Sequence, residues 1–168
     1  TAGTLSIASN GKLYLGGNPN QRAVQLVLTG NNTGVAADLA SGASLDLTVS
    51  TETVSRSADS GWAAIQAENG SIRISGTEPS INVNIYGLGA AGDWAILPEF
   101  TINALYAENG LVTADGTSWT ADMVNLTYAG FANLVYDIGK MLSDDGRLFQ
   151  VRFTKLGDSP LKDYASTD

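Results

Sequence analysis

The stretch AIQAENGSIRISG, residues 64–76, carries the turn signal that decides the fold of this chain. Asn69-Gly70 stands at its centre, and Asn and Gly accept the positive φ angles that a two-residue type I′ turn needs. Such a turn pairs Ala67 with Ile72, and the rest of the ladder then puts apolar pairs on one face and polar pairs on the other. Turn chemistry and hydrophobic pattern therefore agree on a β-hairpin.

A second stretch, ALYAENGLVTADG, residues 104–116, predicts another hairpin in the same way. Six of its thirteen positions match residues 64–76, at a spacing of 40. We interpret the match as two hairpins that meet the same turn requirement. A duplicated sheet unit is the alternative, although two copies are too few for a solenoid. A third Asn-Gly pair, Asn10-Gly11, marks a further turn.

Four other segments alternate apolar and polar residues with the period of a half-buried strand. They lie near residues 24–28, 45–49, 81–85 and 149–153. In the third of them, Asn82 and Asn84 alternate with apolar residues, whereas a buried parallel strand is apolar throughout. This pattern favours antiparallel sheets with one solvated face.

Evidence for helices is sparse. Six apolar residues between positions 130 and 142 follow helical spacing and predict one short helix: Phe131, Leu134, Val135, Ile138, Met141 and Leu142. Val35 to Ala40 could form another single turn. The predicted fold is therefore all-β, an antiparallel β-sandwich or jelly roll of eight or more strands with one short helix. Residues 1–156 form a single domain in this interpretation, and residues 157–168 form a tail or arm.

Composition excludes several classes of function. The 168 residues include no histidine and no cysteine, which removes the commonest general base, the commonest zinc ligands and any disulfide. The net charge of −8 disfavours a nucleic-acid partner, because an acidic surface repels phosphates. No apolar run approaches the roughly 18 residues of a membrane helix, so no membrane partner is predicted. We predict no catalytic residue, no metal ligand and no cofactor, and hence no enzyme.

Three patterns that could carry chemistry are weak. Gly87 to Gly92 has the spacing of a dinucleotide-binding loop, but Pro98 leaves no room for the phosphate-holding helix. Ser9 to Lys12 fits a Ser-x-x-Lys motif, but it spans a predicted turn. Asp144-Asp145-Gly146 has too few ligands for a calcium loop.

Two further sets of side chains could carry a function. Paired carboxylates can hydrolyse glycosides without histidine, and four acidic residues are available: Glu52, Glu99, Glu108 and Asp115. Aromatic side chains could form a platform for sugar, although aromatics on strands more often belong to the core. That set comprises Trp62, Trp94, Trp119, Tyr14, Tyr86, Tyr106 and Tyr128.

In style the chain resembles virion proteins of tailed bacteriophages, in particular small capsid decoration or cement proteins. The likeness rests on short predicted hairpins rich in Gly, Ala, Thr and Asn through residues 1–128, an acidic cysteine-free body and a tail that ends Ala165-Ser166-Thr167-Asp168. The resemblance implies a β-sandwich, jelly-roll or β-tulip module that sits as a dimer or trimer over gaps between capsid subunits. Fimbrial and adhesin subunits share this style.

We therefore expect a non-enzymatic structural subunit of a virion, a capsid decoration protein that stabilises the shell through protein contacts. The expected partners are the major capsid protein or like subunits, with a homo-oligomer, and the tail would reach onto a neighbour. The alternative is a carbohydrate-binding or adhesin module at the cell surface that uses exposed Trp and Tyr side chains.

Overall fold

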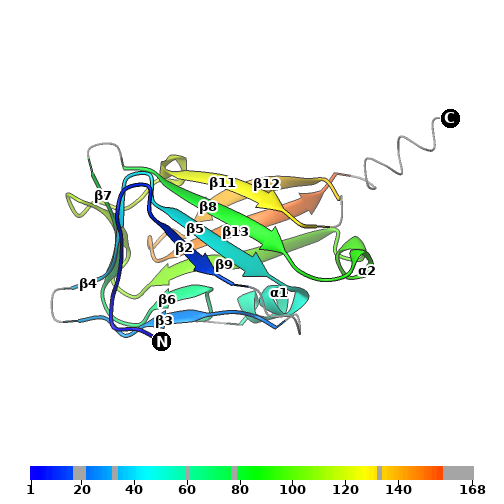
Figure 1. Cartoon of the computed structure of the whole chain (residues 1–168), viewed down its shortest axis with the longest axis horizontal. Helices are drawn as coiled ribbons and strands as arrows, with labels where there is room; N and C mark the ends of the chain where they lie inside the picture. The colour runs from blue at the N-terminus through cyan, green and yellow to red at the C-terminus, as the bar shows by residue number, and fades with distance from the viewer. Residues whose placement is uncertain (17–21, 32–33, 60, 77–78, 132–133, 157–168) are drawn as a thin grey trace.

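The computed structural model describes residues 1–16, 22–31, 34–59, 61–76, 79–131 and 134–156, and strands dominate this part of the chain. Figure 1 shows the elements. The strands are β1 (Leu5–Ile7), β2 (Lys12–Leu15), β3 (Leu26–Leu28), β4 (Val35–Ala40), β5 (Ser44–Val49), β6 (Ile65–Ala67), β7 (Ser71–Ser75), β8 (Ile81–Gly87), β9 (Glu99–Ala107), β10 (Leu111–Thr113), β11 (Val124–Ala129), β12 (Tyr136–Leu142) and β13 (Leu148–Lys155). Two short α-helices, α1 (Thr51–Ser57) and α2 (Ala91–Ala95), and a 3-10 turn, η1 (Ala121–Met123), complete the set.

These strands form three sheets, which the chain visits in a fixed cyclic order. We name each sheet after its strand in the third circuit. The β7 sheet has the order β1-β4-β7-β10, the β8 sheet β2-β5-β8-β11, and the β9 sheet β3-β6-β9-β13-β12. Strands of successive circuits pair in parallel through the first three circuits, for example Ser44 with Asn82 and Ile65 with Leu105. The chain therefore winds as a parallel β-solenoid of three coils and a partial fourth, whose strand β12 joins the β9 sheet through antiparallel β13.

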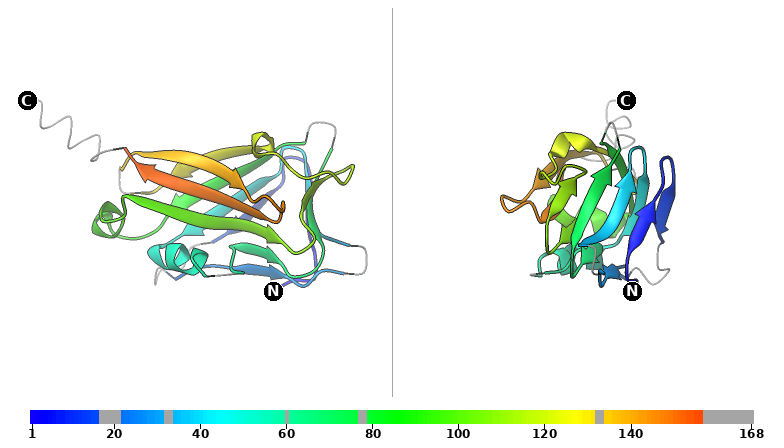
Figure 2. Two further views of the ribbon diagram at one scale, coloured as in Figure 1. Left: turned by 180° about the vertical axis from the view of Figure 1, so that it is seen from behind. Right: turned by 90° about the vertical axis from the view of Figure 1, so that its left-hand side faces the viewer.

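This arrangement shows that the predicted antiparallel sandwich is wrong. The β8 and β9 sheets face each other across the core, as two layers of a sandwich would, but the chain passes from one to the other in a coil. The β7 sheet closes one end of this cross-section, and α1 and α2 lie at the opposite end (Figures 1 and 2). Among the described residues, no helix has the length and apolar sequence that crossing a membrane requires.

Alternation along each strand fills the core, because successive side chains of a strand point to opposite faces. In β5, Leu45 and Leu47 point inward and are 1% and 0% exposed. On the outer face of the same sheet, polar side chains join neighbouring strands: the Asn84 amide donates a hydrogen bond to Asp46 at 2.6 Å, and Lys12 pairs with Asp46 at 3.4 Å. A solenoid strand is thus half-solvated even though it is parallel.

The two long Asn-Gly stretches form corners of the solenoid, so the predicted hairpins are wrong. Asn69-Gly70 and Asn109-Gly110 both turn the chain from the β9 sheet into the β7 sheet. The corners stack, since the Asn109 N–H donates to the Gly70 carbonyl at 3.0 Å. Ile72, expected opposite Ala67, lies beside Leu111 of the next coil. The sequence match between residues 64–76 and 104–116 therefore reflects equivalent corners of two successive coils.

The predicted helix over residues 130–142 is also wrong. Residues 136–142 form β12, which pairs antiparallel with β13. Ile138 and Leu142 are four apart, a spacing that a helix face and a strand face share, and pairing with β13 decides between the two. Val35–Ala40 is strand β4 and not a turn. The proposed tail, residues 157–168, lies outside the described residues.

The helix that precedes β6 was not predicted. Ser50 caps α1: its N–H donates to the Thr53 hydroxyl at 2.9 Å, and the Thr53 N–H donates to the Ser50 hydroxyl at 3.4 Å. This reciprocal capping satisfies donors that a helix start leaves open. The helix packs against β9 and β5.

One end of the solenoid is closed by aromatic side chains and by a returning strand. β13 runs antiparallel between β9 and β12, and Phe131 and Tyr136 are 2% and 3% exposed. Lys140 reaches from β12 to donate to the Val124 carbonyl of β11 at 2.8 Å. The backbone N–H of Trp119 donates to the Leu111 carbonyl of β10 at 3.0 Å, so residues near Trp119 cover the outer edge of β10.

The other end is the first coil, and it is more open. β1 and β2 are edge strands, each paired with one neighbour among the described residues. Ala2 stacks on Leu28 in a parallel bridge, in line with the β9 sheet. Leu13 and Leu15 of β2 are half-buried, whereas their row partners in the next coil are fully buried. The apolar core thus extends into the first coil, where its leucine side chains remain partly exposed to solvent.

Candidate functional site

The four carboxylates considered for glycoside hydrolysis are not brought together. Each has its own partner: Glu52 accepts from the Ala23 N–H at 2.6 Å, Glu99 pairs with Arg152, Glu108 accepts from the Tyr106 hydroxyl at 2.6 Å, and Asp115 accepts from the hydroxyls of Thr113 and Thr117. Among the described residues, Asp115 lines one groove and Glu52 another, and neither groove contains a second of the four carboxylates. The paired acid and base that hydrolysis needs are therefore not assembled from them.

Asp115 has a structural role in the turn that follows β10. Hydrogen bonds from Thr113, and then from Thr117, lower the pKa of Asp115 to about 2. A carboxyl group with that pKa stays ionised at neutral pH and cannot serve as a general acid. Its place between β10 and the bend that follows makes it a structural residue of that turn.

The dinucleotide-type glycine motif and the Ser-x-x-Lys motif have structural roles as well. Gly87 to Gly92 leads into α2, which has only five residues. Gly87 leaves room for the Phe131 ring, because a Cβ there would lie 2.8 Å from it. In the other motif, Ser9 to Lys12 turns the chain into β2, and Lys12 pairs with Asp46. Both segments serve packing.

Asp144-Asp145-Gly146 is a tight turn between β12 and β13. The Ser143 hydroxyl donates to Asp145 at 2.6 Å, and the Arg147 N–H donates to it at 3.1 Å. These bonds, the first above all, lower the pKa of Asp145. In the part of the chain that the structure describes, no group of three acidic side chains lies close enough together to hold a metal ion.

The aromatic residues divide between core and surface. Trp94 and Trp119 are 0% and 2% exposed, so neither can stack on a ligand. Tyr14 is 60% exposed on the outer face of the β8 sheet. Trp62 and Tyr106 are half-buried and line one groove. Tyr86 and Tyr128 are also half-buried. Of the seven aromatic residues, Trp62 and Tyr106 are the pair that shares this groove.

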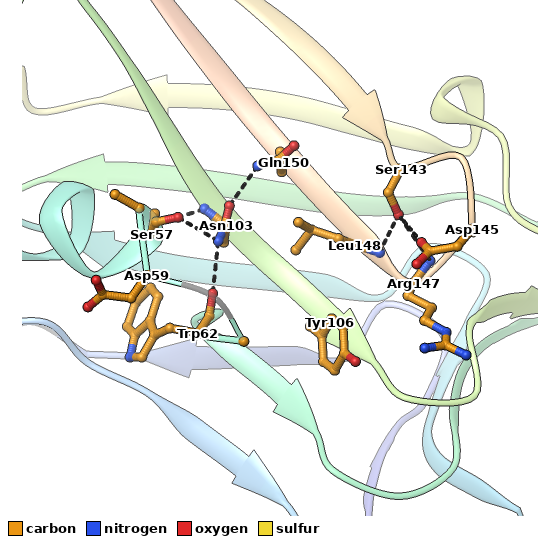
Figure 3. Close-up of a pocket in the computed structure, with 12 residues that line it drawn as sticks. Ser57, Asp59, Trp62, Asn103, Tyr106, Ser143, Asp145, Arg147, Leu148 and Gln150 are labelled. Atoms are coloured by element: carbon orange, nitrogen blue, oxygen red, sulfur yellow. Dashed lines mark hydrogen bonds between the residues drawn. The ribbon is translucent and has the colours of Figure 1, made fainter.

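That groove lies on the outer face of the β9 sheet, and we call it the β9 groove. Figure 3 shows its lining. It has a volume of about 400 Å³ and runs from the segment after α1 to the turn between β12 and β13. The side chains used below are Asp59, Trp62, Asn103, Tyr106, Arg147 and Gln150.

Asn103 forms the floor of the β9 groove and is 5% exposed. Its side-chain amide donates to the carbonyls of Ser57 and Trp62 at 2.8 and 2.9 Å, and its oxygen accepts from Gln150 at 2.8 Å. These bonds tie the end of α1 and the Trp62 segment to β9 and β13 (Figure 3). A buried amide with its partners in place fixes the position of Trp62.

A β-bulge in β9 aims Tyr106 into the same groove. Phe149 of β13 pairs with Leu105, whereas Gln150 pairs with Asn103, so Ala104 is an extra residue in β9. The bulge shifts the alternation by one residue, which turns Leu105 into the core and Tyr106 outward. The Tyr106 hydroxyl donates to Glu108, and this bond raises the pKa of Tyr106.

Sequence reasoning missed the β9 groove for a physical reason. Asn103 and Gln150 each look like an ordinary solvent-facing strand residue, and only the pairing of β9 with β13 brings them together. One signal was available: two apolar residues in succession, Ala104-Leu105, break the alternation of β9 and mark a bulge.

Comparison with known proteins gives no further guide to this site. No family model, no curated protein and no solved structure matches the chain.

Proposed function

We propose that this chain is a non-enzymatic structural subunit that acts by binding other protein subunits. The observation that carries the proposal is the first coil, where the edges of β1 and β2 and half-buried leucines lie at one end of a rigid solenoid. Edge strands of this kind pair with strands of another chain, and apolar side chains beside them add buried area.

Lys12 does not place its charge where it would prevent another strand from pairing with the edge of β2. Lysines on edge strands often prevent association by keeping a charge in the path of an incoming strand. Here the Lys12 ammonium lies along the sheet toward Asp46 of β5, at 3.4 Å. Its charge is thereby directed to the neighbouring strand of its own sheet, and no other described strand pairs with the outer edge of β2.

The setting that we propose is a virion shell, with the major capsid protein or like subunits as partners. Composition supports this setting: an acidic, cysteine-free chain with a low charged fraction of 15%. The observed fold does not support this setting, because the chain is a solenoid and not the sandwich or jelly roll that the resemblance implied. A scaffold whose coils stack is nevertheless suited to bearing load, since each coil is held by the next.

Replacing Leu13 with lysine tests the proposal. Leu13 and Leu126 occupy the two ends of one inward-facing row of the β8 sheet, and both are half-buried. At either position a lysine can keep its alkyl stem on the core and extend its charge to water, so the fold should survive. We expect light scattering to show a dimer or trimer for the wild type and for Leu126→Lys, and a monomer for Leu13→Lys.

The outcome against the proposal is equally defined. A wild-type chain that stays monomeric at every concentration, and that does not sediment with purified phage capsids, would contradict a role in assembly. Equal oligomer masses for Leu13→Lys and the wild type would place the contact away from the first coil. Circular dichroism of both variants serves as the check on folding.

A further inference from the structure

We infer that the β9 groove binds a neutral oligosaccharide chain, a role independent of assembly through the first coil. The inference rests on two aromatic side chains, a fixed polar floor and unengaged polar groups that line the same groove (Figure 3). Its volume of about 400 Å³ falls within the 300–1,000 Å³ that is typical of small-ligand sites.

Trp62 and Tyr106 supply the apolar contact. Both side chains are half-buried, so part of each ring is exposed to solvent while the rest packs against the protein. The Trp62 carbonyl accepts from Asn103, and the Tyr106 hydroxyl is held by Glu108. Aromatic rings present a flat apolar face that matches the C–H face of a pyranose ring, and their rigidity keeps the entropic cost of binding low.

Polar groups beside the rings have capacity left for hydroxyl groups of a ligand. Among the described residues, neither the Asp59 carboxylate nor the Trp62 indole N–H has a side-chain hydrogen-bond partner. Gln150 uses its amide nitrogen on Asn103, which leaves its carbonyl oxygen to accept. Acceptors and a donor in one groove fit a ligand that carries many hydroxyl groups.

Charge selects a neutral ligand over an acidic one. Two carboxylates line the groove, those of Asp59 and Asp145, against one guanidinium, that of Arg147. The guanidinium also faces Glu108, at 3.9 Å. An acidic sugar would meet net negative charge here, and its binding would be opposed.

Tryptophan fluorescence gives a direct readout, because Trp62 is the one tryptophan of the three that water reaches appreciably. The probes are cellohexaose, maltohexaose and chitohexaose as neutral chains, and hexagalacturonate as the acidic chain. We expect at least one neutral chain to protect Trp62 from iodide quenching at submillimolar concentration, with hexagalacturonate at least tenfold weaker. No protection by any neutral chain at about 1 mM, or tighter binding of hexagalacturonate, overturns the inference.

Three variants locate the binding site. Tyr106→Ala and Asp59→Ala should each weaken binding of that neutral chain at least fivefold, by fluorescence and by calorimetry. Asp59 is exposed, so its replacement should not disturb folding. Tyr14→Ala is the matched control: it removes an exposed aromatic residue from a different sheet and should leave the affinity unchanged. Equal weakening by Tyr14→Ala, or wild-type affinity in Asp59→Ala and Tyr106→Ala, overturns the assignment to the β9 groove.

Discussion

Replacing Trp94 with alanine is expected to lower the free energy of unfolding by about 4 kcal/mol, which is a large share of the stability of a typical domain. Trp94 is fully buried, and its ring centroid lies 4.8 Å from that of Phe131 and 5.4 Å from that of Phe100. Its indole N–H donates to the Leu88 carbonyl at 3.0 Å. The substitution thus removes a large apolar group and leaves a partly buried carbonyl without its donor.

Equilibrium denaturation in urea, followed by far-ultraviolet circular dichroism, measures the change. Trp62→Ala is the matched control, since Trp62 is half-buried on the surface of the β9 sheet. We expect the control to cost less than half as much as Trp94→Ala. A cost for Trp94→Ala near zero would mean that this side chain is solvent-exposed, as a sugar-stacking residue would be.

Gly70→Ala is expected to lower stability by about 3 kcal/mol, and Gly110→Ala by about 1 kcal/mol. The two glycines occupy the same place in successive corners, and both have positive φ, +88° and +97°. A Cβ on Gly70 would lie 2.9 Å from the Gly34 carbonyl oxygen, because another coil stacks against this corner. At Gly110 the nearest backbone atom is at 3.7 Å, so only the cost of the left-handed backbone remains.

Thermal unfolding of the two variants and of Gly34→Ala checks this prediction. Gly34 also has positive φ, +81°, but apart from its chain neighbours no atom of the described residues lies within 4 Å of its Cβ position. For a chain of this length, a difference of about 2 kcal/mol corresponds to roughly 4–8 °C in Tm. Equal Tm values for the Gly70 and Gly110 variants would mean that the corners do not stack.

Alternation and turn residues located many of the elements from the sequence. β5, β8 and β13 lie where the apolar–polar period placed them, and the Asn-Gly pairs do mark changes of chain direction. These signals are local, because they depend on which side chains face water and on which residues accept positive φ. They could not supply the pairing of strands, which is decided by contacts between residues that are far apart in the chain.

The direction of pairing was misjudged for a specific reason. Asn82 and Asn84 indicate an antiparallel strand only by analogy with α/β proteins, whose parallel sheets are covered on both faces. In a solenoid each strand has one face in the core and one in water, so alternation is compatible with parallel pairing. The outward Asn84 and Thr127 then interact through side chains along the stack.

The coil repeat was hard to recognise because the coils differ in length. Leu13, Leu45, Val83 and Leu126 occupy one row of the β8 sheet, yet the gaps between them are unequal. Insertions such as α1 and α2 lie between the strands and change the spacing from coil to coil. No single period therefore fits all the coils, and the spacing of 40 fits the two corners at residues 64–76 and 104–116.

Disulfide trapping tests the central claim, coil-on-coil stacking, most directly, because the chain has no cysteine of its own. Arg73 and Val112 are partners in adjacent parallel strands, β7 and β10. Neighbouring strands lie about 4.8 Å apart, within the range of Cα separations that a disulfide spans. Gln66 and Arg73, which a hairpin would pair, belong to different sheets on either side of a corner.

The measurement compares two double variants that share one cysteine, in a glutathione redox buffer, by mass spectrometry of the unreduced protein. The solenoid predicts that Arg73→Cys with Val112→Cys closes an intramolecular disulfide, while Gln66→Cys with Arg73→Cys keeps two free thiols. A disulfide in the second variant, with free thiols in the first, would contradict the account.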